Sequence, residues 1–367
     1  MEAKHKIDRW LLTMHDKKAS DLHLTVGSPP KLRIHGDLGP LDEPVLTNEL
    51  LEEILPEICT PAQWAAFKRD NDMDFAYAIP GYARFRTNYL VQQFGMGAVM
   101  RMIPEAMMTF EELGLPNSVL QFVELGFGLI LVTGPTGSGK TTTLASIIDY
   151  VNEHYRRHVL TIEEPIEFVH RHKQCLITQR EVGMHTKSFS SALRCAMRMD
   201  PNVVLVGEMR DTETISLALT CAETGVLVFG TLHTNSASRT VDRIIDVFPA
   251  EEQARIRTML ASSLKGVIAQ QLLRTADGKG RVASFEILVG TPALGNLIRT
   301  AQTVKIDSMI QSGGGLGMQT MDSHIQKLLE AGRISGEEAY MKAFDKKTFE
   351  KHWSFSVETE EGEEEGR

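Results

Sequence analysis

The stretch 134-GPTGSGKT-141 decides how this sequence folds. It matches the pattern G-x-x-x-x-G-K-[ST] at every constrained position, and such a glycine-rich loop presents its backbone N–H groups to phosphate. The apolar run 129-LILV-132 before it predicts a buried strand, and residues 142–151 after it have helical spacing. A chance glycine-rich turn is the alternative, but it explains neither flank. Strand, loop and helix in this order predict a nucleotide-binding α/β domain.

Further apolar runs alternate with helical patterns beyond this loop. They are 158-HVLTI-162, 203-VVLV-206 and 226-VLVF-229. Continuous apolar strands between helices predict a mostly parallel sheet that is buried on both faces. After about residue 250 the sequence indicates helices. The break 312-SGGGLG-317 follows no strand, so a hinge between helices is a better interpretation than a second nucleotide loop.

Residues 1–103 have the pattern of a separate, small α+β module. Short alternating runs bounded by turn residues predict strands, and apolar residues at helical spacing predict helices. The predicted strands are 21–26, 31–35, 82–90 and 97–103, and the predicted helices are 7–15, 47–55 and 61–69.

Composition excludes several classes of protein. The 367 residues, 42% of them hydrophobic, fit a globular chain of about two or three domains. The net charge of -9, partly from the acidic end 358-ETEEGEEEGR-367, argues against a general nucleic-acid-binding protein. The four cysteines form no C-x-x-C pair, so we expect free thiols in a reducing cytoplasm. No signal peptide is indicated and no apolar run approaches the ~20 residues that span a bilayer, so any membrane role should go through a partner.

Acidic residues follow two of the predicted strands. Glu163 and Glu164 lie in 161-TIEEPIEF-168, and Glu208 lies one glycine past a later strand. Functional groups of open α/β sheets gather beyond the carboxyl ends of the strands. Phosphoryl transfer needs groups that hold a metal ion and position a water molecule, and these carboxylates suit that chemistry. The alternatives are an exposed turn for the first pair, and for Glu208 an ion pair with Arg210 or another neighbour.

A histidine ends another buried strand. The stretch 223-ETGVLVFGTLHTN-235 runs from a strand into His233 and a polar loop. This topology matches that of the two acidic sites, so we expect His233 on the phosphate side of the same site. A structural histidine that caps the loop is the alternative.

These four features, in this order, resemble the motifs of the type II/IV secretion-system ATPases: a Walker A loop, an acidic "Asp box", an atypical Walker B segment and a "His box". The stretches 19-ASDLHLTVGSPPKLRIHGDL-38, 81-GYARFRTN-88 and 100-MRMIP-104 resemble the type IV pilus retraction group, the PilT/PilU-like twitching motility proteins. The resemblance covers roughly residues 5–345. Assembly ATPases usually carry a tetracysteine zinc loop, which this sequence lacks, so the retraction group fits better.

The resemblance implies an α/β fold in which a PAS-like α+β domain precedes a RecA-like P-loop NTPase domain with C-terminal helices. We expect the N-terminal domain at 1–103, a linker at 104–112, the ATPase domain with its helical part at 113–345 and an acidic tail, disordered by composition, at 346–367.

The resemblance further implies a homohexameric motor that hydrolyses ATP with Mg²⁺ and drives pilus retraction. It would work in the cytoplasm, at the inner membrane, on a platform protein of the pilus, without inserting into the membrane or binding nucleic acid. A second retraction ATPase is a further candidate partner. The alternatives are an accessory ring subunit that mainly binds ATP and assists another motor, a pilus or secretion assembly ATPase, and a nucleic-acid motor, against which the acidic charge argues.

The resemblance also implies roles for individual residues. Thr141 and Glu163 would hold Mg²⁺, Glu208 would orient or deprotonate the attacking water, and His233 would sense the γ-phosphate. Arg86 and Arg101 would complete the catalytic site from the N-terminal domain. For each arginine, a surface or ion-pairing role is the alternative. The residues expected to bind ATP are Gly134, Pro135, Thr136, Gly137, Ser138, Gly139, Lys140, Thr141, Thr142, Arg194 and Arg198.

The sequence departs from the family pattern at a few positions. Glu164 replaces an aspartate of the Asp box, and Val226 replaces the first histidine of the His box. In 293-ALGNLIRT-300, Gly295 and Thr300 replace an arginine and a glutamate. Loss of this charged pair weakens the polar contacts of that helix face, and glycine lowers helix propensity by about 1 kcal/mol relative to alanine. These departures motivate the accessory-subunit alternative.

Overall fold

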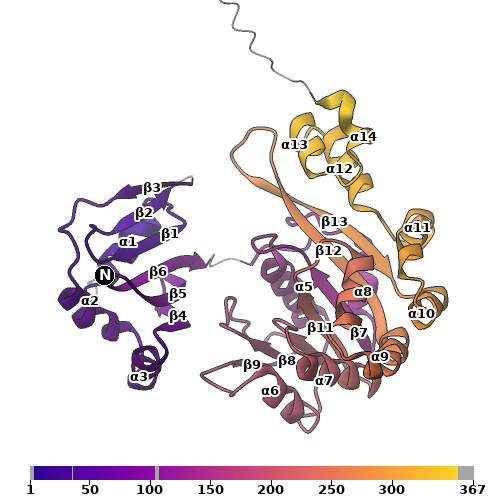
Figure 1. Ribbon diagram of the computed structural model, residues 1–367, viewed down its shortest axis with the longest axis horizontal. Coiled ribbons are helices and arrows are strands. Elements are labelled where there is room, and N and C mark those ends of the chain that lie inside the picture. The colour runs from indigo at the N-terminus through magenta and orange to yellow at the C-terminus, as the bar shows by residue number, and fades with distance from the viewer. Residues whose placement is uncertain (1–3, 35, 104–106, 354–367) are drawn as a thin grey trace, which may run out of the picture. The chain divides into compact units, whose positions relative to one another are not determined.

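The computed structural model describes residues 4–34, 36–103 and 107–353 (Figure 1). It contains a six-stranded sheet of order β3-β2-β1-β6-β5-β4 and a seven-stranded sheet of order β13-β12-β7-β11-β10-β8-β9. The chain forms two compact units. Unit 1 is Met1–Met108 with Ile148–Gly207, and unit 2 is Thr109–Ile147 with Glu208–Arg367. Among the described residues, no helix has the length and apolar character needed to cross a membrane.

The first part of unit 1 is an antiparallel sheet with short helices. Its strands are β1 (Asp21–Thr25), β2 (Lys31–Ile34), β3 (Asp37–Pro40), β4 (Asp72–Ile79), β5 (Ala83–Gln92) and β6 (Gly95–Ile103), and its helices are α1 (Asp8–Asp16), α2 (Asn48–Ile54), η1 (Leu55–Ile58) and α3 (Pro61–Asp70). All neighbouring strands pair antiparallel. The predicted helices and strands of this region are confirmed; β3 and β4 were not predicted.

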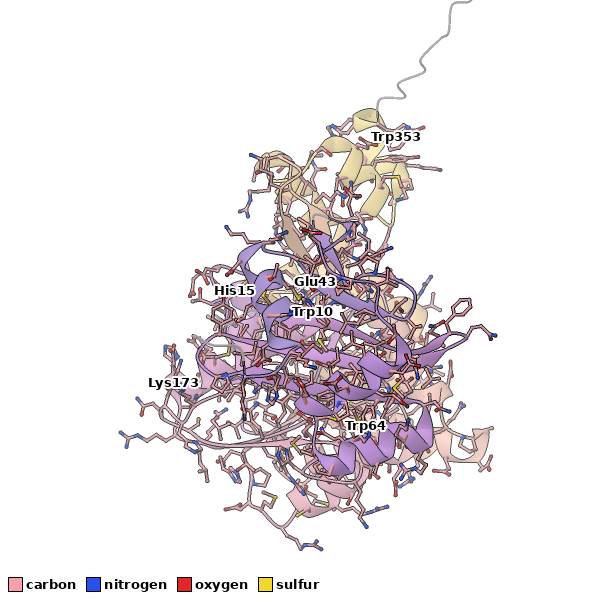
Figure 2. All side chains as sticks on the ribbon, turned by 90° about the vertical axis from the view of Figure 1, so that its left-hand side faces the viewer. Trp10, His15, Glu43, Trp64, Lys173 and Trp353 are labelled. Carbon is pink, nitrogen blue, oxygen red and sulfur yellow. The ribbon has the colours of Figure 1, made fainter. Side chains whose placement is uncertain are left out.

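Local sequence explains where these helices begin, and aromatic residues fill the core beneath them. Thr60 and Gln63 form a reciprocal capping box at the start of α3. Trp64 of α3, labelled in Figure 2, packs at 5.4 Å between ring centroids on the fully buried Phe67. Phe67 in turn meets Tyr89 of β5 edge-on. The helix is therefore fixed to the sheet by a continuous aromatic cluster.

The second part of unit 1 contributes parallel strands. Its elements are β8 (His158–Glu163), β9 (Leu176–Glu181), α6 (Phe189–Ala196) and β10 (Val203–Val206). Strand β8 pairs parallel with both β10 and β9. Lys173, labelled in Figure 2, forms ion pairs with Asp149 and Glu153 ahead of β9.

Unit 2 contains the strand–loop–helix arrangement predicted from the sequence. Its strands are β7 (Gly128–Thr133), β11 (Leu227–Leu232), β12 (Leu264–Arg274) and β13 (Arg281–Val289). Its helices are η2 (Asn117–Val119), α4 (Leu120–Val123), α7 (Thr212–Glu223), α8 (Ala237–Asp246), α9 (Ala250–Ser263), α10 (Pro292–Arg299), η3 (Thr303–Lys305), α11 (Ile306–Ser312), η4 (Gly314–Leu316), α12 (Met321–Glu330), α13 (Gly336–Lys342), α14 (Lys346–Phe349) and η5 (Glu350–His352), and α5 (Lys140–His154) begins here. Every residue of β7 and β11 is buried, and β11 and β12 both run parallel to β7. The expected mostly parallel, doubly covered sheet is confirmed.

The expectation of helices throughout the region after residue 250 is wrong. Strands β12 and β13 form a long antiparallel hairpin, drawn in orange in Figure 1. The Asp277-Gly278 dipeptide in its connection is a strong hairpin signal, and Gly278 has a φ of 69°. Within β12, Gly266 leaves room for the Phe122 ring, because a Cβ at this position would lie 2.5 Å from it. Helices resume only with α10.

Two expectations fall partly outside the described residues. The linker prediction includes residues 104–106, and the acidic-tail prediction includes residues 354–367; both segments lie outside the described ranges. Within the described part of that tail, residues 346–352 form α14 and η5, and Phe349 is fully buried against α12 and α13.

Candidate functional site

The loop between β7 and α5 has the backbone of a phosphate-binding loop. Gly134, Gly137 and Gly139 have φ values of 151°, 77° and 88°, which residues other than glycine rarely adopt. A Cβ on Gly134 would lie 2.3 Å from the carbonyl oxygen of Gln270 and 2.5 Å from Ser138 Oγ. The helix begins at Lys140, and the first N–H groups of a helix bind anions well. The loop therefore fits a phosphate group.

Lys140 lies over this loop. Its Nζ donates hydrogen bonds to the carbonyl oxygens of Gly134 and Pro135, at 2.8 and 3.1 Å. Burial lowers the pKa of Lys140, and the charge of Glu208 opposes that shift. Anionic phosphate oxygens are stronger acceptors for an ammonium group than neutral carbonyls. Lys140 is therefore placed to exchange these two contacts for a bound phosphate.

A buried amide holds the loop from behind. Gln270 of β12 is 2% exposed; its Nε2 donates to the carbonyl oxygen of Ser138, and its Oε1 accepts from Thr143 Oγ1, both at 2.7 Å. These two bonds join the loop, the first turns of α5 and the neighbouring strand. Sequence analysis missed Gln270 because it assigned this region to helices. No local signal identifies it, since Gln271 beside it is polar as well and its two partners lie far away in the sequence.

Glu208 and His233 come together beside Arg210. Glu208 Oε1 lies 3.1 Å from His233 Nε2 and 2.6 Å from Arg210 Nε, while its Oε2 accepts from Arg210 Nη2 at 2.6 Å. Burial alone would raise the pKa of Glu208, but the hydrogen bond and charge of Arg210, with His233 and Lys140, hold it below its usual value. The ion pair that was the alternative role of Glu208 is thus present together with the predicted grouping of Glu208, His233 and Lys140.

Glu163 ends β8 in unit 1. Its Oε1 accepts from Thr161 Oγ1 at 2.7 Å and from Gln179 Nε2 at 3.2 Å. Burial raises the pKa of Glu163 to about 7, although both hydrogen bonds oppose the shift. A bound cation would stabilise the ionised form of a buried carboxylate, so Glu163 suits the metal role that the sequence suggests. That role stays a prediction. Thr141, the other predicted metal ligand, lies exposed in the first turn of α5.

The predicted arginines are exposed or ion-paired in unit 1. Arg86 pairs with Asp74 and Glu167 at 3.6 and 3.4 Å, and Arg101 pairs with Asp21 at 2.8 Å. Arg86 and Arg101 thus form ion pairs, which was the alternative role for each of them, and their roles toward ATP stay predictions. The roles of two other exposed arginines, Arg194 at the end of α6 and Arg198 just beyond it, also stay predictions.

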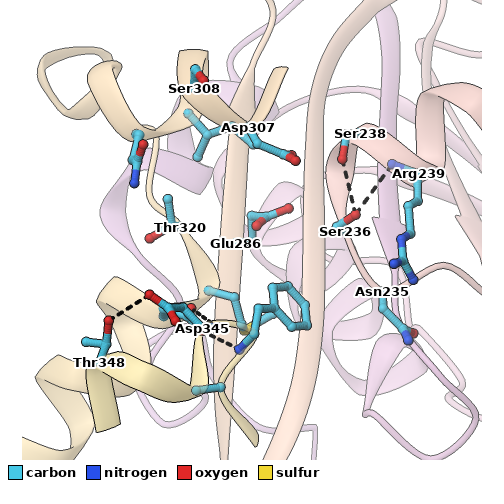
Figure 3. A pocket seen from close by; sticks show the side chains of 16 residues that line it. Asn235, Ser236, Ser238, Arg239, Glu286, Asp307, Ser308, Thr320, Asp345 and Thr348 are labelled. Atoms are coloured by element: carbon cyan, nitrogen blue, oxygen red, sulfur yellow. Dashed lines mark hydrogen bonds between the residues drawn. The ribbon is translucent and has the colours of Figure 1, made fainter. Parts of the chain in front are cut away.

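Unit 2 also contains a cavity of about 840 Å³, bordered by β13, α8, α11, α12 and α14 (Figure 3). Glu286 of β13 lies at its centre and is 5% exposed; its Oε1 accepts from the N–H of Ala237, the first residue of α8, at 2.8 Å. Burial raises the pKa of Glu286 to about 7, and the charges of Asp307 and Asp322 add to that shift.

We expect Glu286→Gln to make the protein more stable at pH 8 and to lose this advantage as the pH falls to about 4.5. The folded state holds a proton on Glu286 up to about pH 7, whereas the unfolded chain releases it near the ordinary glutamate value. Wild-type stability therefore falls as the pH rises between these values, by roughly 3 kcal/mol, and a neutral amide avoids that loss. Thermal unfolding of both proteins from pH 4.5 to 8 measures the difference. Glu252→Gln at an exposed helix position is the matched control; parallel pH curves for wild type and Glu286→Gln would contradict the prediction.

Comparison with known proteins places the chain among relatives. The family described as "Type II/IV secretion system protein" matches residues 4–315. The "Type IV pilus retractation ATPase PilT" of Pseudomonas aeruginosa is 52% identical over 325 residues, which are 89% of this chain and 94% of that protein. A "Twitching motility protein" of Neisseria gonorrhoeae is 50% identical over 314 residues, covering 86% of this chain and 84% of that protein.

The solved structures agree with the sequence relatives. The crystal structure of "the Pilus Retraction Motor PilT and Bound ADP" is 43% identical to this chain, with a TM-score of 0.85, and covers 95% of this chain and 100% of that one. This similarity confirms the expected fold, a P-loop NTPase domain preceded by an α+β domain. A family match over most of the chain and relatives at half identity give the same answer, and the chain belongs to the type II/IV secretion system protein family.

Proposed function

We propose that this protein is an ATP-hydrolysing motor that drives type IV pilus retraction and works as a homohexamer. The observation that carries the proposal is the grouping in unit 2 of a phosphate loop, Lys140 and a carboxylate, Glu208, held beside His233. The relatives named above for pilus retraction and twitching motility support the same activity.

In this proposal the residues of the loop, Gly134–Thr142, hold ATP, and Lys140 binds the β- and γ-phosphates. Thr141 and Glu163 would hold Mg²⁺, and the ion would supply positive charge to the transferring phosphoryl group. The described residues include no cluster of three or more His, Cys, Asp or Glu side chains that could hold a metal ion, and Mg²⁺ in such sites is usually bound by one or two protein ligands with phosphate oxygens and water.

The remaining residues act around the reacting phosphate. Glu208 orients the attacking water or accepts its proton, and His233 responds to the γ-phosphate. Arginines neutralise the charge that develops during transfer; the candidates are Arg86, Arg101, Arg194 and Arg198. The proposed partner is the inner-membrane platform protein of the pilus, met from the cytoplasmic side. Nucleic acid has no place in the proposal, which the charge of -9 supports.

A second candidate function is an accessory ring subunit that assists another retraction motor, and Gly295 favours it. A Cβ on Gly295 would lie 2.9 Å from the carbonyl oxygen of Ala261, so the close packing of α10 on α9 depends on glycine. An arginine, which the family pattern has at this position, would require α10 to shift. The helix that the pattern ties to retraction therefore packs here on a glycine where the pattern has an arginine.

Deletion of the gene should raise the number of surface pili and abolish twitching, because extension would continue without retraction. Electron microscopy with a count of pili per cell is the measurement, and re-expression of the gene is the control. Loss of pili would instead indicate an assembly ATPase.

Steady-state ATPase activity of the purified chain, measured alone and mixed with a second retraction ATPase, separates a motor from an accessory subunit. An accessory subunit should show little ATP turnover alone.

A further inference from the structure

We propose that Arg210 is a positioning residue that, together with His233, holds the carboxylate of Glu208 by both oxygens and leaves one acceptor site of Oε2 to receive the attacking water. The proposal rests on the proposed function, because it needs Glu208 to act on that water. From the sequence, Arg210 was expected only as an alternative ion-pair partner of Glu208. The geometry assigns it a part in the site.

The contacts of the Glu208 carboxylate are unequal. Oε1 lies in ion-pair contact with two groups, Arg210 Nε at 2.6 Å and His233 Nε2 at 3.1 Å. Oε2 accepts one hydrogen bond, from Arg210 Nη2 at 2.6 Å. An ionised carboxylate has about four acceptor sites, two on each oxygen. Arg210 and His233 face three of them, so the fourth lies on Oε2.

The local backbone explains why these side chains meet. Met209, between Glu208 and Arg210, is buried, and its N–H donates to the carbonyl oxygen of Thr231 in β11 at 3.1 Å. A Cβ on Gly230 would lie 2.4 Å from Met209 Sδ, so this glycine makes room for the methionine. The contact between Glu208 and Arg210 places these two side chains on one face of the segment, with the buried Met209 between them in the chain.

The form of the contact gives Arg210 a role that a lone charge could not take. The two parallel bonds of a guanidinium to a carboxylate fix its plane as well as its position. A glutamate side chain otherwise samples several rotamers, and holding a reacting group in one orientation accounts for a large part of catalysis. Arg210 is 66% exposed at its side chain and Glu208 20%, so the guanidinium is the more solvated partner of this pair.

Three variants test the proposal. Arg210→Gln should lower kcat for ATP roughly 10- to 100-fold while KM stays within about twofold, because the orientation of Glu208 is lost and the phosphate contacts are kept. Arg210→Lys keeps the charge without the fork, so its kcat should lie between those of wild type and Arg210→Gln. In a Glu208→Gln background, Arg210→Gln should add no further loss, since a residue that acts only through Glu208 has nothing left to position.

The controls separate this inference from the proposed function. Arg255→Ala removes another exposed arginine of unit 2 with a local carboxylate partner, Glu252, and should leave turnover unchanged. Thermal unfolding of each variant checks that folding is intact. If wild type hydrolyses ATP and Arg210→Gln turns over at the wild-type rate, the inference fails while the function stands. A faster Arg210→Gln, a raised KM with unchanged kcat, or a further loss in the Glu208→Gln background would each overturn it as well, by indicating a brake or a direct phosphate contact.

Discussion

Glu208→Gln should reduce ATP turnover by roughly 10²- to 10⁴-fold, the usual contribution of a general base, while ATP still binds. The change removes the charge and leaves an amide group facing the guanidinium of Arg210, which at present donates to Oε2 and forms an ion pair with Oε1, both at 2.6 Å. One of the two bonds of the fork would then be lost. Lys140 and the glycine-rich loop, which hold the phosphates in our proposal, are untouched by the substitution.

The measurement combines steady-state ATPase activity with direct binding of a fluorescent ATP analogue. Glu252→Gln is the matched control, because Glu252 is also a carboxylate of unit 2 with an arginine partner, Arg255. It should leave both quantities unchanged. Turnover of Glu208→Gln at the wild-type rate would show that another residue acts on the attacking water.

Lys140→Ala should lose both ATP binding and turnover. Its ammonium group is the cation that lies on the carbonyl oxygens of Gly134 and Pro135, over the loop. A hydrogen bond to a charged group contributes about 1.5–3 kcal/mol, so ATP affinity should fall roughly 10- to 100-fold. Turnover should fall further, because the charge that Lys140 supplies to the transferring phosphoryl group is also lost.

Lys265→Ala is the control for this variant. Lys265 is the second residue of β12 in the same unit, donates to the carbonyl oxygen of Ser262 and lies over the ring of Phe127. Its removal should leave ATP binding intact. Unchanged ATP affinity in Lys140→Ala would place the nucleotide elsewhere. The two predictions also check each other, since Glu208→Gln should separate binding from turnover and Lys140→Ala should remove both.

The parts of the fold that could be predicted have a sequence pattern that is compatible with only one kind of secondary and tertiary structure. Strands β7 and β11 are buried at every position, and their sequences are apolar except for one threonine each. Such runs between helices have few solutions besides a doubly covered parallel sheet. The β12–β13 hairpin escaped prediction because its Asp277-Gly278 signal stands in a long polar connection. Helical patterns on both sides of it then outweighed the strand pattern.

The sequence identified those residues of the candidate site that carry a reactive side chain next to the end of a strand. Lys140, Glu208 and His233 each follow a buried strand or lie within the phosphate loop, so the topology of the sheet is enough to identify them. Gln270 was missed because its contacts with Ser138 and Thr143 join residues more than a hundred positions apart. No local pattern records a hydrogen bond of that separation.

The sequence by itself determined the phosphate loop, the family and the residue types of the site, because each of these depends on short stretches with strong local constraints. The glycines at 134, 137 and 139 need positive φ, and a lysine and a carboxylate are required by the chemistry of phosphate. Only the tertiary structure decided that Arg210 and His233 both lie on Glu208 and that Gln270 braces the loop. Both depend on β11 and β12 packing beside distant segments, and the free energy of that packing comes from burial over the whole sheet, which no single stretch contains.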